Sequence, residues 1–180
     1  MWELDDHPIR FAEVGCDCWI KVGRVADDTL IVRPLGAVER LVVAAPQRLD
    51  GGPLGDPAAA ATLPFVTLAA FEGDRIALYG EDGSEVAFTP SVALSTNNIV
   101  AARRAACLGV GAAILPRWFV ADELASGALV NVLPRWRAAT LTIHVAYLPA
   151  RHQPRRLALF LQAIEAGLRE VPGIAPAGTR

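Results

Sequence analysis

The segment 97–136 constrains the fold more than any other part of the chain. An Ala-rich stretch typical of a helix leads into a Gly-Val-Gly turn at 109–111 and an apolar run that ends at Pro116. A second helical pattern, which carries acidic residues, then stops at Gly127. Helix, tight turn, buried strand and second helix in this order predict an α/β crossover unit. Such units place helix N-termini beside strand ends, where small ligands bind.

Composition and charge exclude several classes of protein. Of the 180 residues, 53% are hydrophobic and 20% are charged, so a packed core is expected. The formal net charge is −2, whereas a surface that binds nucleic acid is strongly basic. No window has about 18 uninterrupted apolar residues, as a membrane-spanning helix would need, and the acidic N-terminal segment lacks the apolar core of a signal peptide. The three cysteines show no disulfide pattern, so we expect a cytoplasmic protein without membrane contact.

Short strands dominate the pattern before residue 96. We expect strands over 16–22, 65–68, 76–79, 86–88 and 92–94, and two more within 29–45 on either side of Gly36. A short helical turn is expected at 46–49, and the turn Glu81-Asp82-Gly83-Ser84 predicts a hairpin. Residues 50–62 are rich in glycine, proline and alanine without periodicity, which predicts a surface loop.

Helical patterns are clearer in the rest of the chain. We expect a helix over 97–107 with Asn97 as its N-cap, and another between Pro116 in its first turn and Gly127 at its end. Alternation over 139–147 predicts a strand with unequal faces, and 154–170 has the pattern of an amphipathic helix. The order of elements suits two lobes between which the chain crosses out and returns. The expected division is a first lobe of 1–67 and 148–171, a second lobe of 68–147 and a flexible tail of 172–180.

An ordered set of short motifs carries a family resemblance. In the first lobe the motifs are Asp17-Cys18-Trp19-Ile20-Lys21-Val22-Gly23, Asp27-Asp28-Thr29-Leu30, Leu35-Gly36, Val43-Ala44-Ala45-Pro46, Gly52-Pro53 and Pro57. In the second lobe and the return they are Asn97, Gly109-Val110-Gly111, Leu115-Pro116, Gly127, Leu129-Val130, Leu133-Pro134-x-Trp136, Tyr147, Arg151 and Pro154-Arg155-Arg156 through Phe160. From Leu4 to about Leu168, this set resembles the effector-binding (substrate-binding) domain of LysR-type transcriptional regulators. Lys21 stands where that family usually has arginine, and Gln47-Arg48-Leu49 departs from its usual Ala-Tyr-Leu.

The resemblance implies a fold, a function and a set of partners. The fold would be α/β with two lobes, like periplasmic binding proteins of type 2, and would hold a small effector in the cleft between the lobes. The chain would be the sensor of a transcription regulator that binds DNA through an N-terminal domain and works as a homo-oligomer. It would need no cofactor and would not be an enzyme. The family's winged helix-turn-helix and the first strand and helix of the domain are expected to be absent, which would leave the first lobe incomplete with an unpaired strand edge.

Seven residues are candidates for effector binding. They form two groups at the ends of expected elements: Lys21, Val22 and Gly23 after a strand, and Thr96, Asn97, Asn98 and Ile99 at a helix start. The free N–H groups and the dipole of a helix N-terminus favour an anion such as a carboxylate. Thr96 offers a hydroxyl to the same ligand, and Lys21 offers a positive charge. The alternatives are a plain N-cap for the asparagines and a solvated or ion-paired side chain for Lys21.

The other motifs receive structural interpretations. The Gly-x-Gly at 109–111 is weak evidence for a phosphate loop, and tight packing between helix and strand explains it better. Cys16 and Cys18 would share one face of a strand but lack further ligands, and the histidines have no metal-like spacing, so no metal site is expected. No nucleophile elbow or Walker motif is present. Three rival functions remain: a stand-alone solute-binding protein of the same fold, an enzyme on the same two-lobed frame, and a degenerate truncated regulator.

Overall fold

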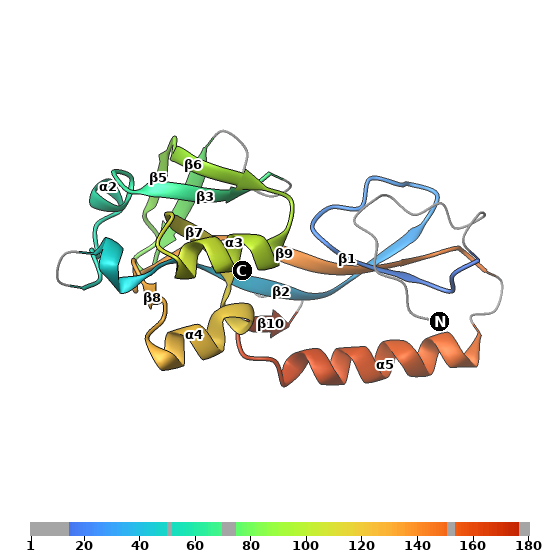
Figure 1. Cartoon of the computed structure of the whole chain (residues 1–180). Coiled ribbons are helices and arrows are strands. Elements are labelled where there is room, and N and C mark those ends of the chain that lie inside the picture. Colours follow the sequence, from blue (N-terminus) through green and yellow to red (C-terminus); the bar gives the residue numbers. More distant parts are fainter. Residues whose placement is uncertain (1–14, 50–51, 70–74, 151–153, 177–180) are drawn as a thin grey trace. The chain divides into compact units, whose positions relative to one another are not determined.

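The computed structural model describes residues 15–49, 52–69, 75–150 and 154–176, which form a mixed α/β fold (Figure 1). The strands are β1 (Trp19–Val22), β2 (Ile31–Ala44), β3 (Pro64–Leu68), β4 (Ile76–Gly80), β5 (Glu85–Phe88), β6 (Ser91–Thr96), β7 (Ala112–Pro116), β8 (Val130–Asn131), β9 (Trp136–Tyr147) and β10 (Ile174–Pro176). The helices are α2 (Pro57–Ala60), α3 (Ile99–Cys107), α4 (Ala121–Ser126) and α5 (Arg155–Arg169), with the 3-10 turns η1 (Pro46–Arg48) and η2 (Arg117–Val120). None of these helices is long and apolar enough to cross a membrane.

The chain divides into two compact units. The first unit comprises Met1–Ala37, Thr142–Val171 and Ala175–Arg180, and the second comprises Val38–Leu141 and Pro172–Ile174. The chain therefore passes from one unit to the other within β2, within β9 and shortly after α5. These units begin and end at other residues than the lobes expected from the sequence, 1–67 with 148–171 and 68–147, and that division stays a prediction.

The central strands of the sheet in the second unit, β2, β3 and β7, are buried on both faces. The strands of this sheet belong to the order β5-β4-β9-β2-β7-β3-β6, in which β3 is parallel to β6 and β7, and β2 is antiparallel to β7. Successive side chains of a strand point to opposite faces. Val42 and Val43 of β2 consequently belong to different apolar clusters, and both are fully buried.

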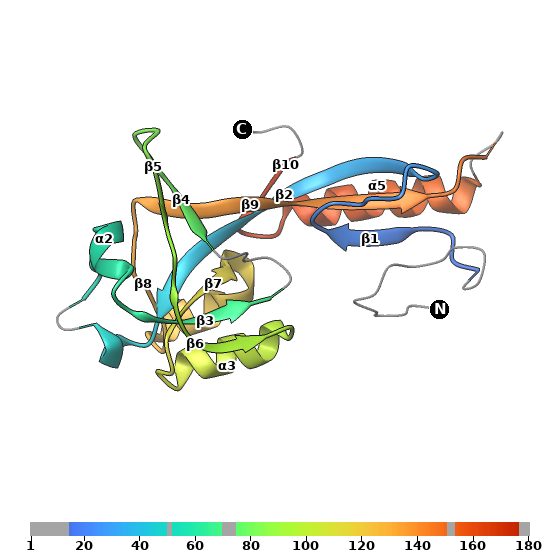
Figure 2. The ribbon, with the colours of Figure 1, turned by 90° about the horizontal axis from the view of Figure 1, so that it is seen from above.

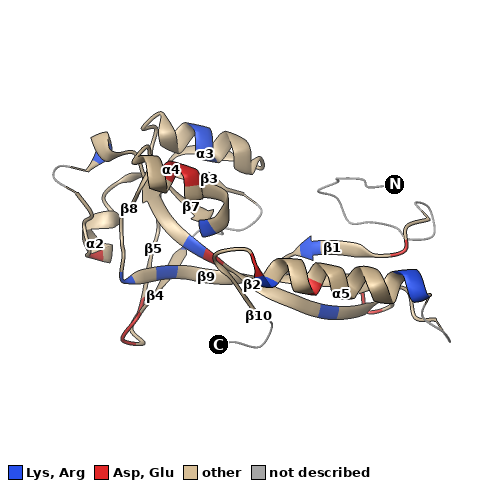
Figure 3. Ribbon diagram, turned by 90° about the horizontal axis from the view of Figure 1, so that it is seen from below, with Lys and Arg blue, Asp and Glu red and all other residues tan. Residues whose placement is uncertain are grey.

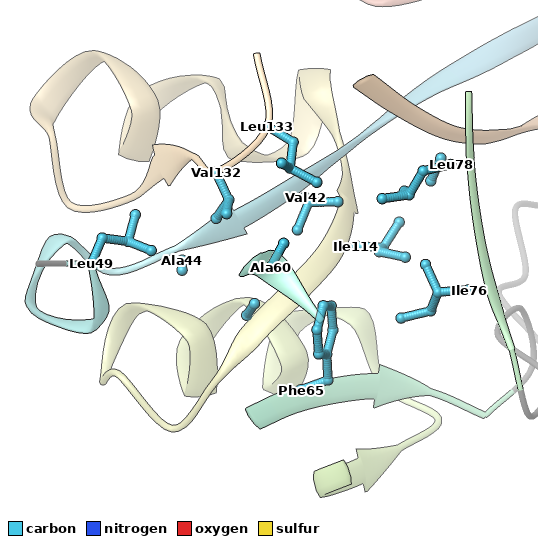
Figure 4. Close-up of a cluster of buried hydrophobic side chains, with 12 residues drawn as sticks. Val42, Ala44, Leu49, Ala60, Phe65, Ile76, Leu78, Ile114, Val132 and Leu133 are labelled. Atoms are coloured by element: carbon cyan, nitrogen blue, oxygen red, sulfur yellow. The ribbon is translucent and has the colours of Figure 1, made fainter. Parts of the chain in front are cut away.

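The two clusters form the core of the second unit. The first lies on one face of the sheet (Figure 4) and includes Val42, Leu49, Phe65, Ile76, Leu78, Ile114, Val132 and Leu133. The second packs α3 and α4 against the other face and includes Leu41, Val43, Val66, Ala102, Ala106, Leu115 and Val120. The buried side chains that α3 contributes are alanines, and their small size lets the helix approach the sheet closely.

The first unit is built on a smaller ladder. β1 runs antiparallel to β9 (Figure 2), with Lys21 opposite His144. α5 buries Leu157 and Leu161, which lie on one face because they are four residues apart. Two ion pairs tie α5 to the rest of the unit, Arg33 with Glu165 and Arg156 with Asp17.

Most elements predicted from the sequence are confirmed. β3, β4, β5, β6 and β9 cover the strands expected over 65–68, 76–79, 86–88, 92–94 and 139–147. α5 matches the amphipathic helix expected over 154–170 to within a residue at each end. The expected hairpin turn forms between β4 and β5, where the Gly80 N–H donates to the Ser84 carbonyl over 2.8 Å and Gly83 has φ +83°.

Three local predictions are wrong. Residues 29–45 hold one continuous strand, β2, because Gly36 keeps an extended backbone and does not turn the chain. The loop expected over 50–62 contains α2, whose N-cap Asp56 accepts the N–H of Ala58 at 3.0 Å. The tail expected to be flexible from residue 172 contains β10, which pairs with β2, while 177–180 lie outside the described residues.

Gly111 is expected to be irreplaceable for packing. A Cβ at this position would lie 2.5 Å from the Pro64 carbonyl oxygen and 2.9 Å from its carbon, and these backbone atoms are held in β3. We expect Gly111→Ala to lower the free energy of unfolding by about 1–3 kcal/mol. Urea denaturation followed by circular dichroism measures this change.

Gly167→Ala is the matched control, because a Cβ at Gly167 in α5 meets nothing within 4 Å. Alanine there should stabilise the helix by about 0.5–1 kcal/mol. Equal effects of the two substitutions would contradict the close approach of the turn at 109–111 to β3.

Candidate functional site

The helix start at 96–99 is capped by its own side chains. The N-cap of α3 is Asn98, whose Oδ1 accepts the N–H groups of Val100 and Ala101 at 2.9 and 3.0 Å. The Thr96 hydroxyl oxygen accepts the Asn98 N–H at 3.1 Å. The sequence-based assignment of Asn97 as the N-cap is therefore wrong by one residue, because only at position 98 does the amide reach the first turn.

This capping limits what an anion finds at α3. A helix leaves its first N–H groups without acceptors inside the helix. Of those groups, the ones on Asn98, Val100 and Ala101 already have side-chain acceptors, whereas within the described residues the structure records none for Ile99. The exposed Asn97 amide and the Thr96 hydroxyl hydrogen can also donate. The plain N-cap interpretation accounts for Asn98, and these remaining donors are available to a ligand.

The second candidate group lies at the end of β1 in the first unit. Lys21 is half-buried, and its Nζ lies 4.9 Å from the centre of the Trp19 ring, within range of a cation–π interaction. Lys21 is the basic residue of β1, which is blue at one position in Figure 3. Val22 is 38% exposed. Gly23 ends the strand with φ +93°, a conformation that glycine adopts without strain.

His144 belongs to the same group and was not among the residues singled out from the sequence. Its Nδ1 lies 2.8 Å from the Gly23 carbonyl oxygen, and the Gly23 N–H donates to the Thr142 carbonyl over 2.8 Å. The available signal was the alternation of β9, which sets Thr142 and His144 on the face opposite Ile143 and Val145. Only the register of β1 against β9 brings His144 next to Lys21.

The structure thus assembles the candidates as two separate groups. Lys21, Val22 and Gly23 are together in the first unit, and Thr96, Asn97, Asn98 and Ile99 are together in the second. Each group offers hydrogen-bond donors, and the first adds a positive charge. Neither arrangement contains a nucleophile paired with a base.

The cysteines and turn carboxylates serve other purposes. Burial raises the pKa of the Cys18 and Cys107 thiols, so little thiolate, the reactive form, is present at neutral pH. Hydrogen bonds from Ser84 and Thr29 hold the pKa values of Asp82 and Asp27 below the ordinary value, which suits turn formation at exposed positions. In the described part of the chain, no three His, Cys, Asp or Glu residues are grouped to hold a metal ion.

Comparison with known families identifies the chain. Residues 5–169 match the family described as the LysR substrate binding domain. The chain belongs to this family. The resemblance recognised from the sequence motifs is therefore confirmed, and the family consists of transcription regulators rather than enzymes.

Curated relatives are LysR-type regulators of greater length. The uncharacterized HTH-type transcriptional regulator YhjC of Escherichia coli K12 is 28% identical over 172 residues, which cover 92% of this chain and 56% of that protein. The HTH-type transcriptional activator AaeR of the same organism is 24% identical over 151 residues, which cover 83% of this chain and 49% of that protein. The chain spans about half the length of the curated relatives it matches.

Solved structures agree on the fold. The full-length virulence activator AphB of Vibrio cholerae has a TM-score of 0.72 at 22% identity, covering 92% of this chain and 56% of that one. The regulatory domain of AphB from Vibrio vulnificus has a TM-score of 0.67 at 23% identity, covering 88% of this chain and 78% of that one. The expected α/β fold of the periplasmic-binding-protein type 2, shared by LysR regulatory domains, is confirmed.

The reassigned cap at α3 makes a direct prediction. Asn98→Ala removes the acceptor of two N–H groups and should lower the free energy of unfolding by about 1 kcal/mol. Asn97→Ala is the matched control and should change it by less than about 0.5 kcal/mol, because the Asn97 side chain is exposed. Thermal or urea denaturation distinguishes the two variants, and a larger loss for Asn97→Ala would contradict the observed cap.

Proposed function

We propose that this LysR substrate-binding domain senses a small anionic effector for a cytoplasmic, homo-oligomeric transcription regulator. The observation that carries the proposal is the family match over residues 5–169, together with relatives named as HTH-type transcriptional regulators. DNA would be bound by a helix-turn-helix domain of the full-length regulator. The domain has no catalytic step and requires no cofactor under this proposal.

Two groups of residues are the proposed contacts. In the second unit, the Thr96 hydroxyl, the Asn97 amide and the Ile99 N–H are donors at the positive end of the α3 dipole. In the first unit, Lys21 supplies a charge next to Val22 and Gly23 at the end of β1. Donors and a cation without a neighbouring nucleophile favour binding of a carboxylate over chemical conversion of it.

Regulation would follow from differential affinity. An effector shifts a protein between two arrangements only by the difference in its affinity for them. The stand-alone solute-binding protein and the degenerate regulator are less favoured, because the relatives that match most of the chain are transcription regulators.

Binding and stability should respond in opposite directions to one substitution. Asn97→Asp places a negative charge at the α3 N-terminus, which should stabilise the helix by about 0.3–1 kcal/mol. The same charge should repel a carboxylate and weaken its binding. The measurement is a thermal-shift screen of small carboxylates followed by calorimetric titration of those that raise the melting temperature.

Controls for this experiment come from the same chain. Lys21→Gln should weaken carboxylate binding by about tenfold or more, since a charged hydrogen bond is lost, while Arg169→Gln at the exposed end of α5 should leave it unchanged. The proposed anionic effector would be contradicted if no carboxylate stabilised the domain. It would also be contradicted if neither Asn97→Asp nor Lys21→Gln changed the affinity for a carboxylate.

A further inference from the structure

The β1–β9 ladder has two chemically different faces. Cross-strand partners in an antiparallel pair share a face. The pairs Ile20 with Val145 and Val22 with Ile143 form an apolar face, on which Ile143 and Val145 are buried. The pair Lys21 with His144 lies on the other face, so the cation and the imidazole are direct cross-strand neighbours.

Gly23 is held at both of its backbone groups on this ladder. Its N–H donates to the Thr142 carbonyl and its carbonyl oxygen lies 2.8 Å from His144 Nδ1. A carbonyl oxygen only accepts hydrogen bonds, so Nδ1 must carry the proton and donate. The bond therefore selects one tautomer of the neutral ring, in which Nε2 is an acceptor.

Lys21 keeps its charge available next to this ring. Its recorded interaction is with the Trp19 ring at 4.9 Å, and the described residues include no ion-pair partner for it. It is also the only lysine of the chain, in which arginine accounts for the other basic side chains. A cation and an acceptor nitrogen are thus cross-strand neighbours at the end of β1.

We propose that His144 is a positioning and specificity residue of the effector site, and that the effector is a carboxylate with a neighbouring hydroxyl or amino group. This inference rests on the proposed function. His144 Nδ1–H fixes Gly23 and with it the end of β1 that carries Lys21. Lys21 binds the carboxylate, and Nε2 accepts the hydrogen bond of the adjacent donor.

The first test measures the ring itself. Two-dimensional ¹H–¹⁵N spectra of the histidine rings at neutral pH, assigned with His144→Asn, should show Nδ1 protonated and Nε2 unprotonated in the ligand-free protein. The opposite tautomer would overturn the inference without any ligand being present, because Gly23 would then have no donor.

The second test uses two probes that differ by one hydroxyl, butanoate and 2-hydroxybutanoate. Reductive ¹³C-methylation labels Lys21 as the only lysine signal, and each probe is titrated against it by NMR. The hydroxylated probe should bind about fivefold to tenfold more tightly, which is the worth of one neutral hydrogen bond. Retention of the charge on methylation keeps Lys21 competent to bind both probes.

Two variants separate the positioning of Gly23 by His144 from the acceptance of a ligand hydrogen bond at its Nε2. The amide nitrogen of His144→Asn can still donate to the Gly23 carbonyl but has no acceptor at the Nε2 position, so the preference for the hydroxylated probe should vanish while butanoate binding persists. His144→Leu lacks both functions and should weaken both probes. A purely structural role would alter the melting temperature without altering the ratio of the two affinities.

The possible results distinguish the role of His144 from the proposed binding of a carboxylate effector. If neither probe shifts the Lys21 signal, both the carboxylate site at Lys21 and the role of His144 are overturned. If both probes bind equally to the parent protein, and His144→Asn leaves both affinities unchanged, only the role of His144 is overturned.

Discussion

The continuous strand β2 is the constraint on which the rest of the second unit depends. β2 is flanked by β9 and β7 in the sheet and also pairs with β8 and β10. Val42 and Val43 are fully buried on opposite faces, so a single strand supplies both apolar clusters. Burial of one such side chain contributes about 1.5–3 kcal/mol relative to exposure. A turn at Gly36 would divide this strand just where the chain enters the second unit, but the strand continues through it.

Charged groups hold the segments around the entry of β2. Glu39 accepts hydrogen bonds from Arg137 Nε at 2.6 Å and from an Arg117 guanidinium nitrogen at 3.2 Å, and its N–H donates to the Gly173 carbonyl over 2.8 Å. Arg40, which is only 6% exposed, donates from Nε to the Ala139 carbonyl at 2.8 Å. A buried charge is costly unless it is hydrogen-bonded, so these partners are required rather than incidental. Position 173 requires glycine for two reasons. Its φ is +81°, and a Cβ there would lie only 2.9 Å from the Arg117 Cβ.

The two candidate groups differ in which atoms could interact with a ligand: backbone N–H groups at α3 and side chains at β1. At α3 the backbone provides the donors, but Asn98 and Thr96 already accept hydrogen bonds from most of them. At β1 the side chains provide the chemistry, and the backbone of Gly23 is the part that must be held in place. Helix capping and anion binding compete for the same N–H groups, whereas Lys21 contacts the Trp19 ring and has no ion-pair partner among the described residues.

Local patterns along the chain were sufficient for much of the fold. Periodicity located β3, β4, β5, β6, β9 and α5, and the ordered motifs identified the family, because these features depend on residues close in sequence. The same patterns failed at Gly36, at 57–60 and at 174–176, where sheet pairing, a cap by Asp56 and the contact of Gly173 with Glu39 override local preference. Lys21 and the helix start were candidates because of their residue types and positions together with the family resemblance. The juxtaposition of Lys21 with His144, which are far apart in the chain, arises only from strand register, because no local signal specifies which residue of β9 stands opposite which residue of β1.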